Sequence, residues 1–362
     1  MAESLKPGKQ QVVTMQGPVC PVPLLHDEQI VLGHGSGGSM THNLVRDQFY
    51  AAFDNEPLLA GDDSATLEPP TGSGRLALTT DSHIVAPLVF PGGDIGRLAV
   101  CGTVNDLAMV GAQPLGLTAG FILEEGLPIA TLQAILESMR QAADEAGIRV
   151  VAGDTKVVER GKGDGVFINT SGLGWVPAGR EISGRNARPG DAVLLTGPIG
   201  DHGIAVLTAR GGLALETDVR SDVAPLNRLI EALLSAFPEV HALRDPTRGG
   251  VATALNEIAR QSRVAIRLDE TVIPVTPSVE SACELLGLDP LYVANEGKAL
   301  IVLPEVHAQA ALQLLHSLRY GEGSVQIGVV REAPAGRVLM RTAIGGTRVV
   351  DTLAGEMLPR IC

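Results

Sequence analysis

The sequence predicts a mixed α/β protein of two domains. Its 362 residues are too many for one ordinary hydrophobic core, and strand-like apolar runs alternate with helical patterns in both halves. A polar stretch with Gly and Pro, residues 178–191, marks the domain junction. We therefore expect domains at 28–184 and 185–345, a loose leader at 1–27 and a mobile tail at 346–362.

In the first half, a short strand at 29–32 precedes the segment GHGSGG and a helical pattern that ends near Phe53. Further strands are predicted at 75–81, 115–123, 148–154 and 165–176, and helices at 95–110 and 130–146. The second of these helices has an apolar face made of Leu132, Ile135, Leu136, Met139 and Ala143. That spacing is typical of a helix packed on a sheet.

The second half repeats this mixture of elements at a similar size. Strands are predicted at 192–197, 264–269, 298–304 and 324–330, and helices near 203–209, 225–237, 249–261, 277–286 and 307–318. After a last short strand, the chain ends in a tail whose final residue is Cys362. A terminal cysteine is either an accident of a tolerant terminus or a reactive group carried on an arm.

Composition excludes several functional classes. The net charge of −13 and the single tryptophan argue against binding to nucleic acid or to anionic membranes. No apolar stretch reaches the roughly 18 residues of a membrane span, and no signal peptide is visible. The four cysteines, Cys20, Cys101, Cys283 and Cys362, form no CxxC pair, so neither zinc nor a disulfide framework is indicated. We expect a cytoplasmic protein.

The segment GHGSGG satisfies the pattern G-x-G-x-x-G with Gly33, Gly35 and Gly38. A dinucleotide fold would need a buried parallel strand after the following helix, but DNEPLLAGDDSA is a loop. A glycine loop that folds over a phosphate is favoured, with Gly35, Gly37 and Gly38 as candidate contacts. A plain turn is the alternative.

Acidic residues recur at predicted strand ends, in a tight loop and inside an apolar helix. The four candidate metal ligands are Asp63, Asp81, Asp106 and Asp245, although Asp62 could replace its neighbour. Asp106 is the most informative, because a carboxylate in so apolar a helix needs a partner or a cation. Oxygen ligands without His or Cys favour Mg²⁺. Helix caps and solvated loop ends are the alternative for each acid taken singly.

Two Gly-rich turns in the second half, LTGPIGDHG and LRDPTRGG, precede helices whose N-termini favour anions. They make Gly200, His202 and Arg248 candidate phosphate contacts. The first half contributes Asn105, Asp154 and Thr155 as further candidates for nucleotide binding. Lys156 and Glu296 lie in GDTK and ANEGK, where a solvated surface is the simplest interpretation of the residues alone.

Several segments resemble one known family. They are TTDSHIVAPLVFPGGDIGRLAVCGTVNDLAMVGA, GFILEEGLP, GDTKVVERG, GDHG, LRDPTRGG, CELLGLDPLYVANEGK and the terminal PRIC. From about residue 28 to the end, the chain is similar to hydrogenase maturation proteins of the HypE family. This family shares a superfamily with aminoimidazole ribonucleotide synthetase and selenophosphate synthetase. The segment GDTKVVERG and the terminal PRIC look particular to HypE.

The resemblance implies a homodimer whose N-terminal sheets join, with ATP and Mg²⁺ bound near that interface. It also implies that a partner carbamoyltransferase loads a carboxamide onto Cys362. The carboxamide would then be dehydrated to a thiocyanate, and an iron-carrying scaffold complex would receive the cyanide for a [NiFe]-hydrogenase. Glu296 would act as the base, and Lys156 would orient or relay. A synthetase of the selenophosphate or purine type and a non-catalytic nucleotide-binding scaffold are the alternatives.

Overall fold

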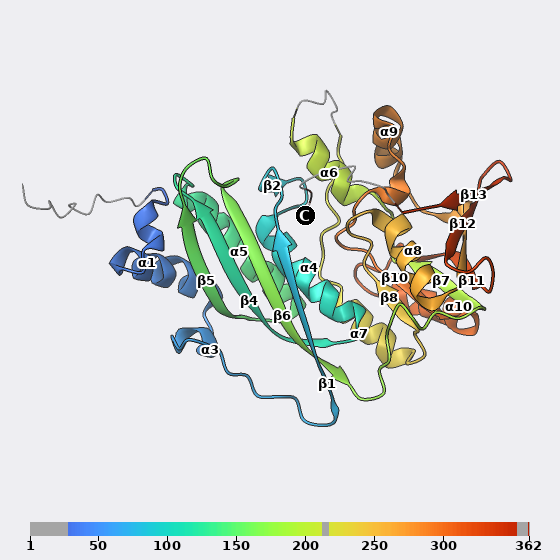
Figure 1. The fold of residues 1–362 in the computed structure, drawn as a ribbon, viewed down its shortest axis with the longest axis horizontal. Coiled ribbons are helices and arrows are strands. Elements are labelled where there is room, and N and C mark those ends of the chain that lie inside the picture. Colours follow the sequence, from blue (N-terminus) through green and yellow to red (C-terminus); the bar gives the residue numbers. More distant parts are fainter. Residues whose placement is uncertain (1–27, 212–216, 353–360, 362) are drawn as a thin grey trace, which may run out of the picture.

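The computed structural model describes residues 28–211, 217–352 and 361. Its strands form a four-stranded sheet in the order β1-β6-β4-β5 and a seven-stranded sheet in the order β13-β12-β9-β11-β7-β10-β8. The two sheets lie in separate halves of the molecule (Figure 1). The expected mixed α/β architecture with two domains is confirmed. The expected leader, 1–27, lies outside the described residues.

The first sheet is made of β1 (Gly74–His83), β6 (Val166–Pro177), β4 (Gln113–Glu124) and β5 (Val150–Val158). Its β4–β5 pair is parallel and its other pairs are antiparallel. Helices α4 (Ile95–Met109) and α5 (Ile129–Ala146) pack on one face, and the five apolar residues expected on α5 are all buried. The helical periodicity of the sequence therefore identified the buried face correctly.

Helix α4 is apolar on nearly all sides because it is enclosed. It contacts α5 and the first sheet, and also α7 (Asn227–Ala236) of the second half. Only Arg97 and Asp106 among its residues are not buried. Asp94 caps its first turn by accepting hydrogen bonds from the amides of Gly96 and Arg97, at 2.7 and 2.9 Å.

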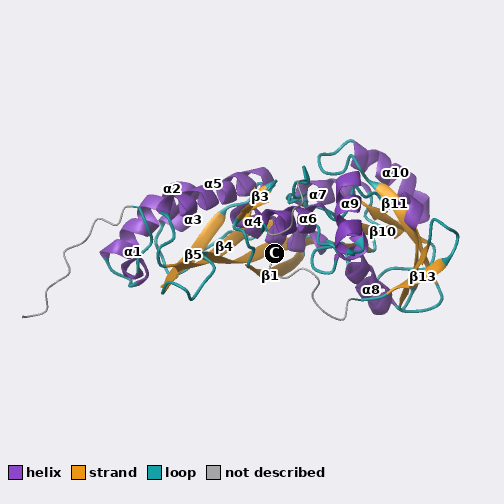
Figure 2. Ribbon diagram, turned by 90° about the horizontal axis from the view of Figure 1, so that it is seen from above, coloured by secondary structure: helices purple, strands orange, loops and turns teal. Residues whose placement is uncertain are grey.

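No helix of the described residues covers the opposite face of the first sheet. Its strands lie in front of α4 and α5 in Figure 1, and in Figure 2 both helices lie on one side of it. Leu76 and Leu78 on β1 are 64% and 79% exposed on this outer face. Large apolar side chains that exposed are typical of a surface that binds a partner.

The residues before β1 form short helices rather than a strand. They are η1 (Leu32–Gly35), α1 (Ser39–Leu44), the π-helical η2 (Val45–Tyr50), α2 (Ala51–Phe53) and α3 (Glu56–Leu59). The strand expected at 29–32 is only an isolated bridge between Gln29 and Pro128. A run of three apolar residues could not distinguish a strand from a turn of helix. A small hairpin of β2 (Val89–Phe90) and β3 (Gly93–Asp94) precedes α4.

The second sheet lies between helices on both faces. Its strands are β7 (Asp191–Leu195), β8 (Ala242–Arg244), β9 (Ala265–Asp269), β10 (Leu300–Pro304), β11 (Val325–Arg331), β12 (Arg337–Arg341) and β13 (Thr347–Val350). Val193 and Leu195 pack in the cluster that includes α8 (Gly250–Ser262), whereas Ala192 and Leu194 pack with α7 and α10 (Glu305–His316). All residues of β7 are therefore buried.

The remaining helices of this half are α6 (Asp201–Ala209) and α9 (Pro277–Leu286), with short turns η3 (Glu270–Val272) and η4 (Pro290–Tyr292). Strand β12 was not expected from the sequence. Residues 347–350, which we assigned to the tail, form β13 and pair with β12, so the sheet extends past residue 345. Residues 353–360 and 362 of the expected tail lie outside the described residues.

Polar contacts join the two halves. The Arg97 guanidinium donates to the Val223 carbonyl at 3.0 Å and pairs with Glu145 at 2.9 Å. Tyr320, from the second half, donates its hydroxyl to the same glutamate. Among the described residues, no helix is long and apolar enough to cross a bilayer.

The packing of α4 on α5 predicts an unusual result for Gly96→Ala. Alanine normally stabilises a helix relative to glycine by about 1 kcal/mol. At this position, however, a Cβ atom would lie 2.4 Å from the Ile135 carbonyl oxygen. We expect the substitution to lower the free energy of unfolding by roughly 1–3 kcal/mol, measured by urea denaturation. Gly163→Ala, where the nearest atom is 3.5 Å away, is the control and should change little.

Candidate active site

Three of the four acids expected to bind metal lie near one another at the boundary between the halves. Asp81 is part of β1, Asp106 is on α4, and Asp245 follows β8. Asp81 lies 3.3 Å from His83 Nε2, and Asp106 accepts a hydrogen bond from the Thr79 hydroxyl at 2.8 Å. Alternation along β1 turns Thr79, Asp81 and His83 toward α4, while Leu76 and Leu78 face outward.

The pKa values show that these acids act on one another. Burial, and then the charge of Asp106, raises the pKa of Asp245 to about 7. Burial also raises the pKa of Asp106, although Thr79 partly opposes it. Burial alone would raise the pKa of Asp81, but its hydrogen bond with His83 holds that pKa below the ordinary value. The group thus carries more buried negative charge than its own cations balance.

Glu296 adds a fourth carboxyl to this group. It is 4% exposed, and burial, followed by the charges of Asp245 and Asp222, raises its pKa well above the ordinary value. Its Oε1 has no hydrogen-bond partner among the residues that the structure describes. A buried carboxyl oxygen without a partner is costly, and it is available to a substrate group.

The backbone of Glu296 is fixed from both sides. Its amide donates to the Asp222 carboxylate at 3.0 Å, and its carbonyl accepts from the Asn105 side chain at 3.3 Å. Asn105 also binds the Ala224 carbonyl at 3.0 Å and the Leu226 amide at 2.8 Å. We expected Asn105 to contact the nucleotide, but its side-chain amide forms hydrogen bonds with the backbone of the second half.

Several other predicted residues line a cavity of about 310 Å³. Its walls include parts of the segment before β1 and of β5, and the predicted residues among them are Gly35, Gly37, Asp62, Asp63, Asp154, Thr155 and Lys156. Gly38 directly follows in the same glycine loop. Asp63 thus lies with the glycine loop and not with the other acids that we grouped with it.

The predicted strand ended at Asp154 and left Lys156 outside it, but both residues lie inside β5. Thr155 is buried toward the helices, whereas Asp154 and Lys156 point to the outer face and pair at 3.0 Å. Asp81 aligns across the sheet with Thr170, Ala119 and Gly153. At about 4.8 Å per strand, roughly 14 Å separates the edge that bears Asp81 from β5. Within one chain, Lys156 and Glu296 are therefore on different faces of the sheet.

Gly200, His202 and Arg248 have distinct places. Gly200 is the N-cap of α6, with a φ of 90°, and donates its amide to Asn295 at 2.7 Å. Arg248 lies close enough to Asp81 and Glu296 to lower the pKa of both carboxyls.

His202 is fully buried, with its ring nitrogens 2.8 Å from the Ser221 hydroxyl and 2.6 Å from the Ile361 carbonyl. We expected His202 to contact a phosphate, but in the structure its ring contacts Ile361 near the C-terminus.

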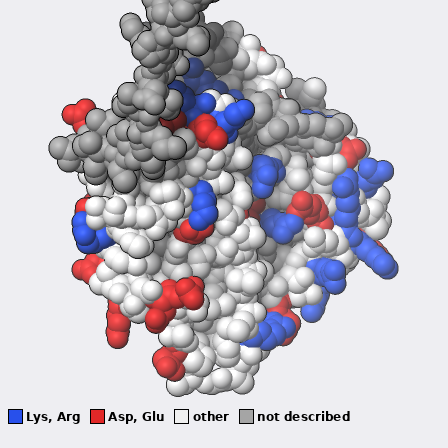
Figure 3. Space-filling view, turned by 60° about the vertical axis from the view of Figure 1, so that its left-hand side comes forward, with Lys and Arg blue, Asp and Glu red and all other residues white. Residues whose placement is uncertain are grey.

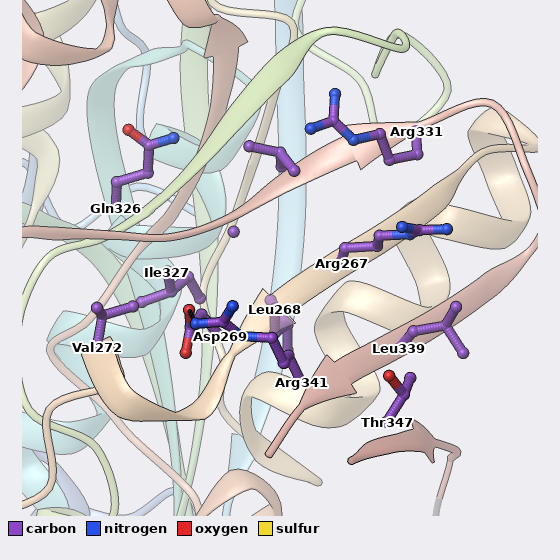
Figure 4. Close-up of a pocket in the computed structure, with 12 residues that line it drawn as sticks. Arg267, Leu268, Asp269, Val272, Gln326, Ile327, Arg331, Leu339, Arg341 and Thr347 are labelled. Atoms are coloured by element: carbon purple, nitrogen blue, oxygen red, sulfur yellow. Dashed lines mark hydrogen bonds and ion pairs between the residues drawn. The ribbon is translucent and has the colours of Figure 1, made fainter. Parts of the chain in front are cut away.

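A larger cavity, of about 690 Å³, lies elsewhere. Figure 4 shows Arg267, Arg331 and Arg341 around it, with Arg341 paired to Asp269 at 2.9 Å. Its walls come from β9, β11, β12 and β13, whereas Asp245 follows β8 at the opposite edge of the sheet. The buried acids, and not this larger cavity, define the candidate site.

The described acids do not form a finished metal site. No group of three His, Cys, Asp or Glu side chains within these residues is close enough together to hold an ion. Their chemistry nevertheless fits Mg²⁺, because the donors are oxygens and a cation would offset the charge that raises their pKa values. Phosphate oxygens could complete the ligand set.

Sequence reasoning missed Ser221 and Asp222. The Asp222 carboxylate, 4% exposed, pairs with Lys298 at 3.1 Å, which holds the pKa of Asp222 below the ordinary value against the effect of burial. These residues lie in an irregular segment without periodicity, so no pattern in the sequence singled them out. Cys101 and Cys283 are buried and free, while Cys20 and Cys362 lie outside the described residues.

Asp201 provides a test of the charge balance. Burial, and then the charge of Asp222, raises its pKa to about 6 from 3.8. Between these values the folded state keeps a proton that the unfolded state loses, so stability falls as the pH rises from about 4 to about 6. We expect Asp201→Asn to stabilise the protein at pH 8 by on the order of 1–2 kcal/mol, after allowance for solvent screening, but not at pH 4. Urea denaturation at both pH values measures the difference, and an equal effect at both would contradict it.

Comparisons with known proteins agree with this geometry. Residues 61–176 match the N-terminal domain of AIR synthase related proteins, and residues 188–341 match their C-terminal domain. The carbamoyl dehydratase HypE of Cupriavidus necator is 55% identical over 92% of this chain and 95% of its own length. The HypE of Escherichia coli is 45% identical over 92% of this chain and 99% of its own.

Solved structures give the same result. A hydrogenase maturation protein HypE in complex with ATP has a TM-score of 0.88 and 50% identity, and the match covers 92% of this chain and 99% of that one. A HypE-HypF complex contains a chain with a TM-score of 0.75 and 51% identity, covering 86% of this chain and 99% of that one. This chain therefore belongs to the HypE family of carbamoyl dehydratases and has the two-domain fold of AIR synthase related proteins.

Proposed function

We propose that this protein is an ATP-dependent carbamoyl dehydratase that converts a carboxamide on the Cys362 sulfur into a thiocyanate during hydrogenase maturation. The observation that carries the proposal is the buried Glu296 carboxyl, whose Oε1 has no partner and which faces the acids of the domain boundary. The family supports the reaction, and the ATP complex of a relative supports the nucleotide.

The reaction balances without a redox partner. The amide oxygen attacks the γ-phosphoryl group of ATP, which breaks the bond to the β-phosphate and releases ADP. The phosphorylated oxygen is a good leaving group, and its departure as phosphate breaks the C–O bond. The nitrogen gives up both of its protons, and the electron pairs form the C≡N bond. Positioning and electrostatics therefore carry the phosphoryl transfer, and a base must take a proton.

Glu296 suits the role of that base. Burial and neighbouring carboxylates raise its pKa, so its carboxylate is a stronger base than that of an exposed glutamate. Asp222 and Asn105 fix its backbone, which lets the carboxyl keep one position. Asp81, Asp106 and Asp245 would hold Mg²⁺, which when bound neutralises charge on the phosphates. Arg248 faces the same acids and could contact a phosphate.

We propose that two chains complete each site. Lys156, Asp154, Asp63 and the glycine loop are separated from Glu296 within one chain, although the family reaction needs them together. The uncovered outer face, with Leu76, Leu78 and Ile122 exposed, offers an apolar surface for a second copy. In a homodimer, Lys156 of one chain would approach Glu296 of the other, and Asp154, Thr155 and Gly35 would contact the shared ATP.

Partners other than a second copy belong to the same proposal. A carbamoyltransferase loads Cys362, and the solved HypE-HypF complex of a relative supports such a partner. An iron-carrying scaffold complex then receives the cyanide. On the face shown in Figure 3, basic side chains are interspersed with acidic ones, and no continuous basic band crosses the described residues seen there. That pattern and the charge of −13 favour protein partners over nucleic acid. We propose a cytoplasmic location.

The mass of the C-terminal peptide tests the reaction. After incubation with the carbamoyl donor system, the peptide that contains Cys362 should gain one carbamoyl group, and ATP should then remove one water from it. A synthetase of another type would not load the tail. A non-catalytic scaffold would keep the carbamoyl group unchanged after ATP addition.

Glu296→Gln should keep carbamoylation and ATP binding but slow the loss of water by roughly 10²–10⁴-fold, because it removes basicity and little else. Single-turnover mass spectrometry with preloaded protein measures this rate. Glu284→Gln, an exposed position on α9, is the matched control. If the Glu296 variant dehydrates at the normal rate, the base is another group.

A mixing experiment tests the shared site. We expect Glu296→Gln and Lys156→Met homodimers each to be slow. After dissociation and reassociation, half of the dimers carry both chains, and half of their sites contain neither substitution. Activity should then recover to about a quarter of the wild-type value. Mixing a chain that bears both substitutions with wild type does not create such a gain. No recovery in the first mixture would place Lys156 and Glu296 in the same chain's site.

A further inference from the structure

The segment Ser221–Val223 passes between the β2–β3 hairpin and the loop that bears Glu296. The Ser221 amide donates to the Pro91 carbonyl at 2.7 Å, and the Val223 carbonyl accepts from Arg97 at 3.0 Å. Two glycines, Gly92 and Gly297, lie against this segment. A Cβ on Gly92 would lie 2.6 Å from the Ser221 nitrogen, and one on Gly297 would collide with the Asp222 carbonyl. This enclosure leaves the backbone of the segment little freedom.

The side chain of Ser221 fixes the state of His202. The Ile361 carbonyl can only accept, so His202 Nε2, at 2.6 Å, carries a proton. Burial lowers the pKa of His202, so the ring is neutral and Nδ1 is an acceptor. The Ser221 hydroxyl donates to Nδ1 at 2.8 Å and accepts from the Val223 amide at 3.1 Å. Every donor and acceptor in this chain of contacts therefore has one assignment.

The side chain of Asp222, the next residue, binds the loop that carries Glu296. The Asp222 carboxylate accepts from the amides of Glu296 and Gly297, at 3.0 and 3.3 Å, and pairs with Lys298 at 3.1 Å. Two adjacent residues thus hold two different partners. Ser221 acts, through His202, on the last described residue of the tail, and Asp222 acts on the backbone of Glu296.

We infer that Ser221 and Asp222 are positioning residues that place the C-terminal tail and Glu296 in register with each other. The Ile361 carbonyl belongs to the planar peptide bond that joins Ile361 to the residue that carries the reactive sulfur. The same rigid segment restrains both this carbonyl and Glu296. It thereby controls how the modified sulfur is positioned relative to the base. Such small displacements decide rates when a reaction depends on orientation.

The inference rests on the proposed dehydration, but its first test does not use that reaction. In Ser221→Ala, His202 loses the donor that fixes its tautomer, and the Ile361 contact weakens. Alkylation of Cys362 by a maleimide, followed as the mass of the C-terminal peptide, should become roughly two- to tenfold faster. Ser221→Thr keeps the hydroxyl and should restore the slow rate. Ser317→Ala removes an exposed serine hydroxyl at the end of α10 and is the matched control.

The second test measures dehydration in single turnover with preloaded protein and saturating ATP. Ser221→Ala should lower the rate of water loss by roughly tenfold without changing ATP affinity, and Ser221→Thr should recover it. Asp222→Asn, which keeps the side chain's shape but not its charge, should lower the rate without accelerating alkylation. Circular dichroism and size-exclusion chromatography confirm that each variant is folded.

The outcomes separate the two hypotheses. If wild type never loses water from the loaded tail, the proposed function fails, whereas the alkylation test still judges the tail anchor. If alkylation is unchanged in Ser221→Ala, or if Ser221→Thr does not restore it, the hydroxyl does not position the tail. Normal dehydration in both Ser221→Ala and Asp222→Asn would overturn the inference that this segment sets the register.

Discussion

Buried negative charge at the boundary between the two sheets is the constraint on which the rest of the site depends. Asp245 and Glu296 have raised pKa values because burial and like charges act on both. The pKa of the buried Asp222 carboxyl is lowered instead, because Lys298 lies against it. Such an arrangement is costly for an isolated chain, and it favours a ligand that brings cations and hydrogen-bond donors. A magnesium nucleotide and a carboxamide together have those properties.

The same boundary explains why α4 is so apolar. It packs against a sheet, a helix of its own half and a helix of the other half, so nearly every position on it must be buried. The polar exceptions have partners: Arg97 binds Glu145 and the Val223 carbonyl, Asn105 holds the Glu296 carbonyl, and Asp106 joins the acids. One helix therefore carries the structural joint and part of the site, which couples the relative position of the halves to catalysis.

The first sheet divides its chemistry between two faces. Alternation along the strands turns Asp81 and His83 toward the helices, and turns Lys156 and Asp154 outward with Leu76 and Leu78. The outer face thus combines apolar surface with the charged residues that we propose take part in the reaction. A second copy that covers this face would satisfy both features with one interface.

Periodicity and composition determined much of this protein. The five buried positions of α5 and the alternation of strands and helices in both halves could be predicted, because local spacing records which side of an element is buried. The role of Asp81, Asp106 and Asp245 in metal binding stays a prediction. The resemblance of particular segments added the family, which composition alone does not reveal. Local patterns were less informative at 29–32, where a short run fits more than one structure. A last short strand was expected near the end of the chain and is present as β13, although we had placed residues from 346 onward in the tail.

Only the tertiary structure decided which residues meet. It placed Asp63 and Lys156 away from Asp81 and Glu296, because strand alternation and sheet order separate residues that look equivalent in the sequence. It also gave His202 the Ile361 carbonyl as a partner, and gave Ser221 and Asp222 their roles. These contacts join residues far apart in the chain through an irregular segment. Because such a segment has no period, its side chains acquire their meaning only from the elements that fold around them.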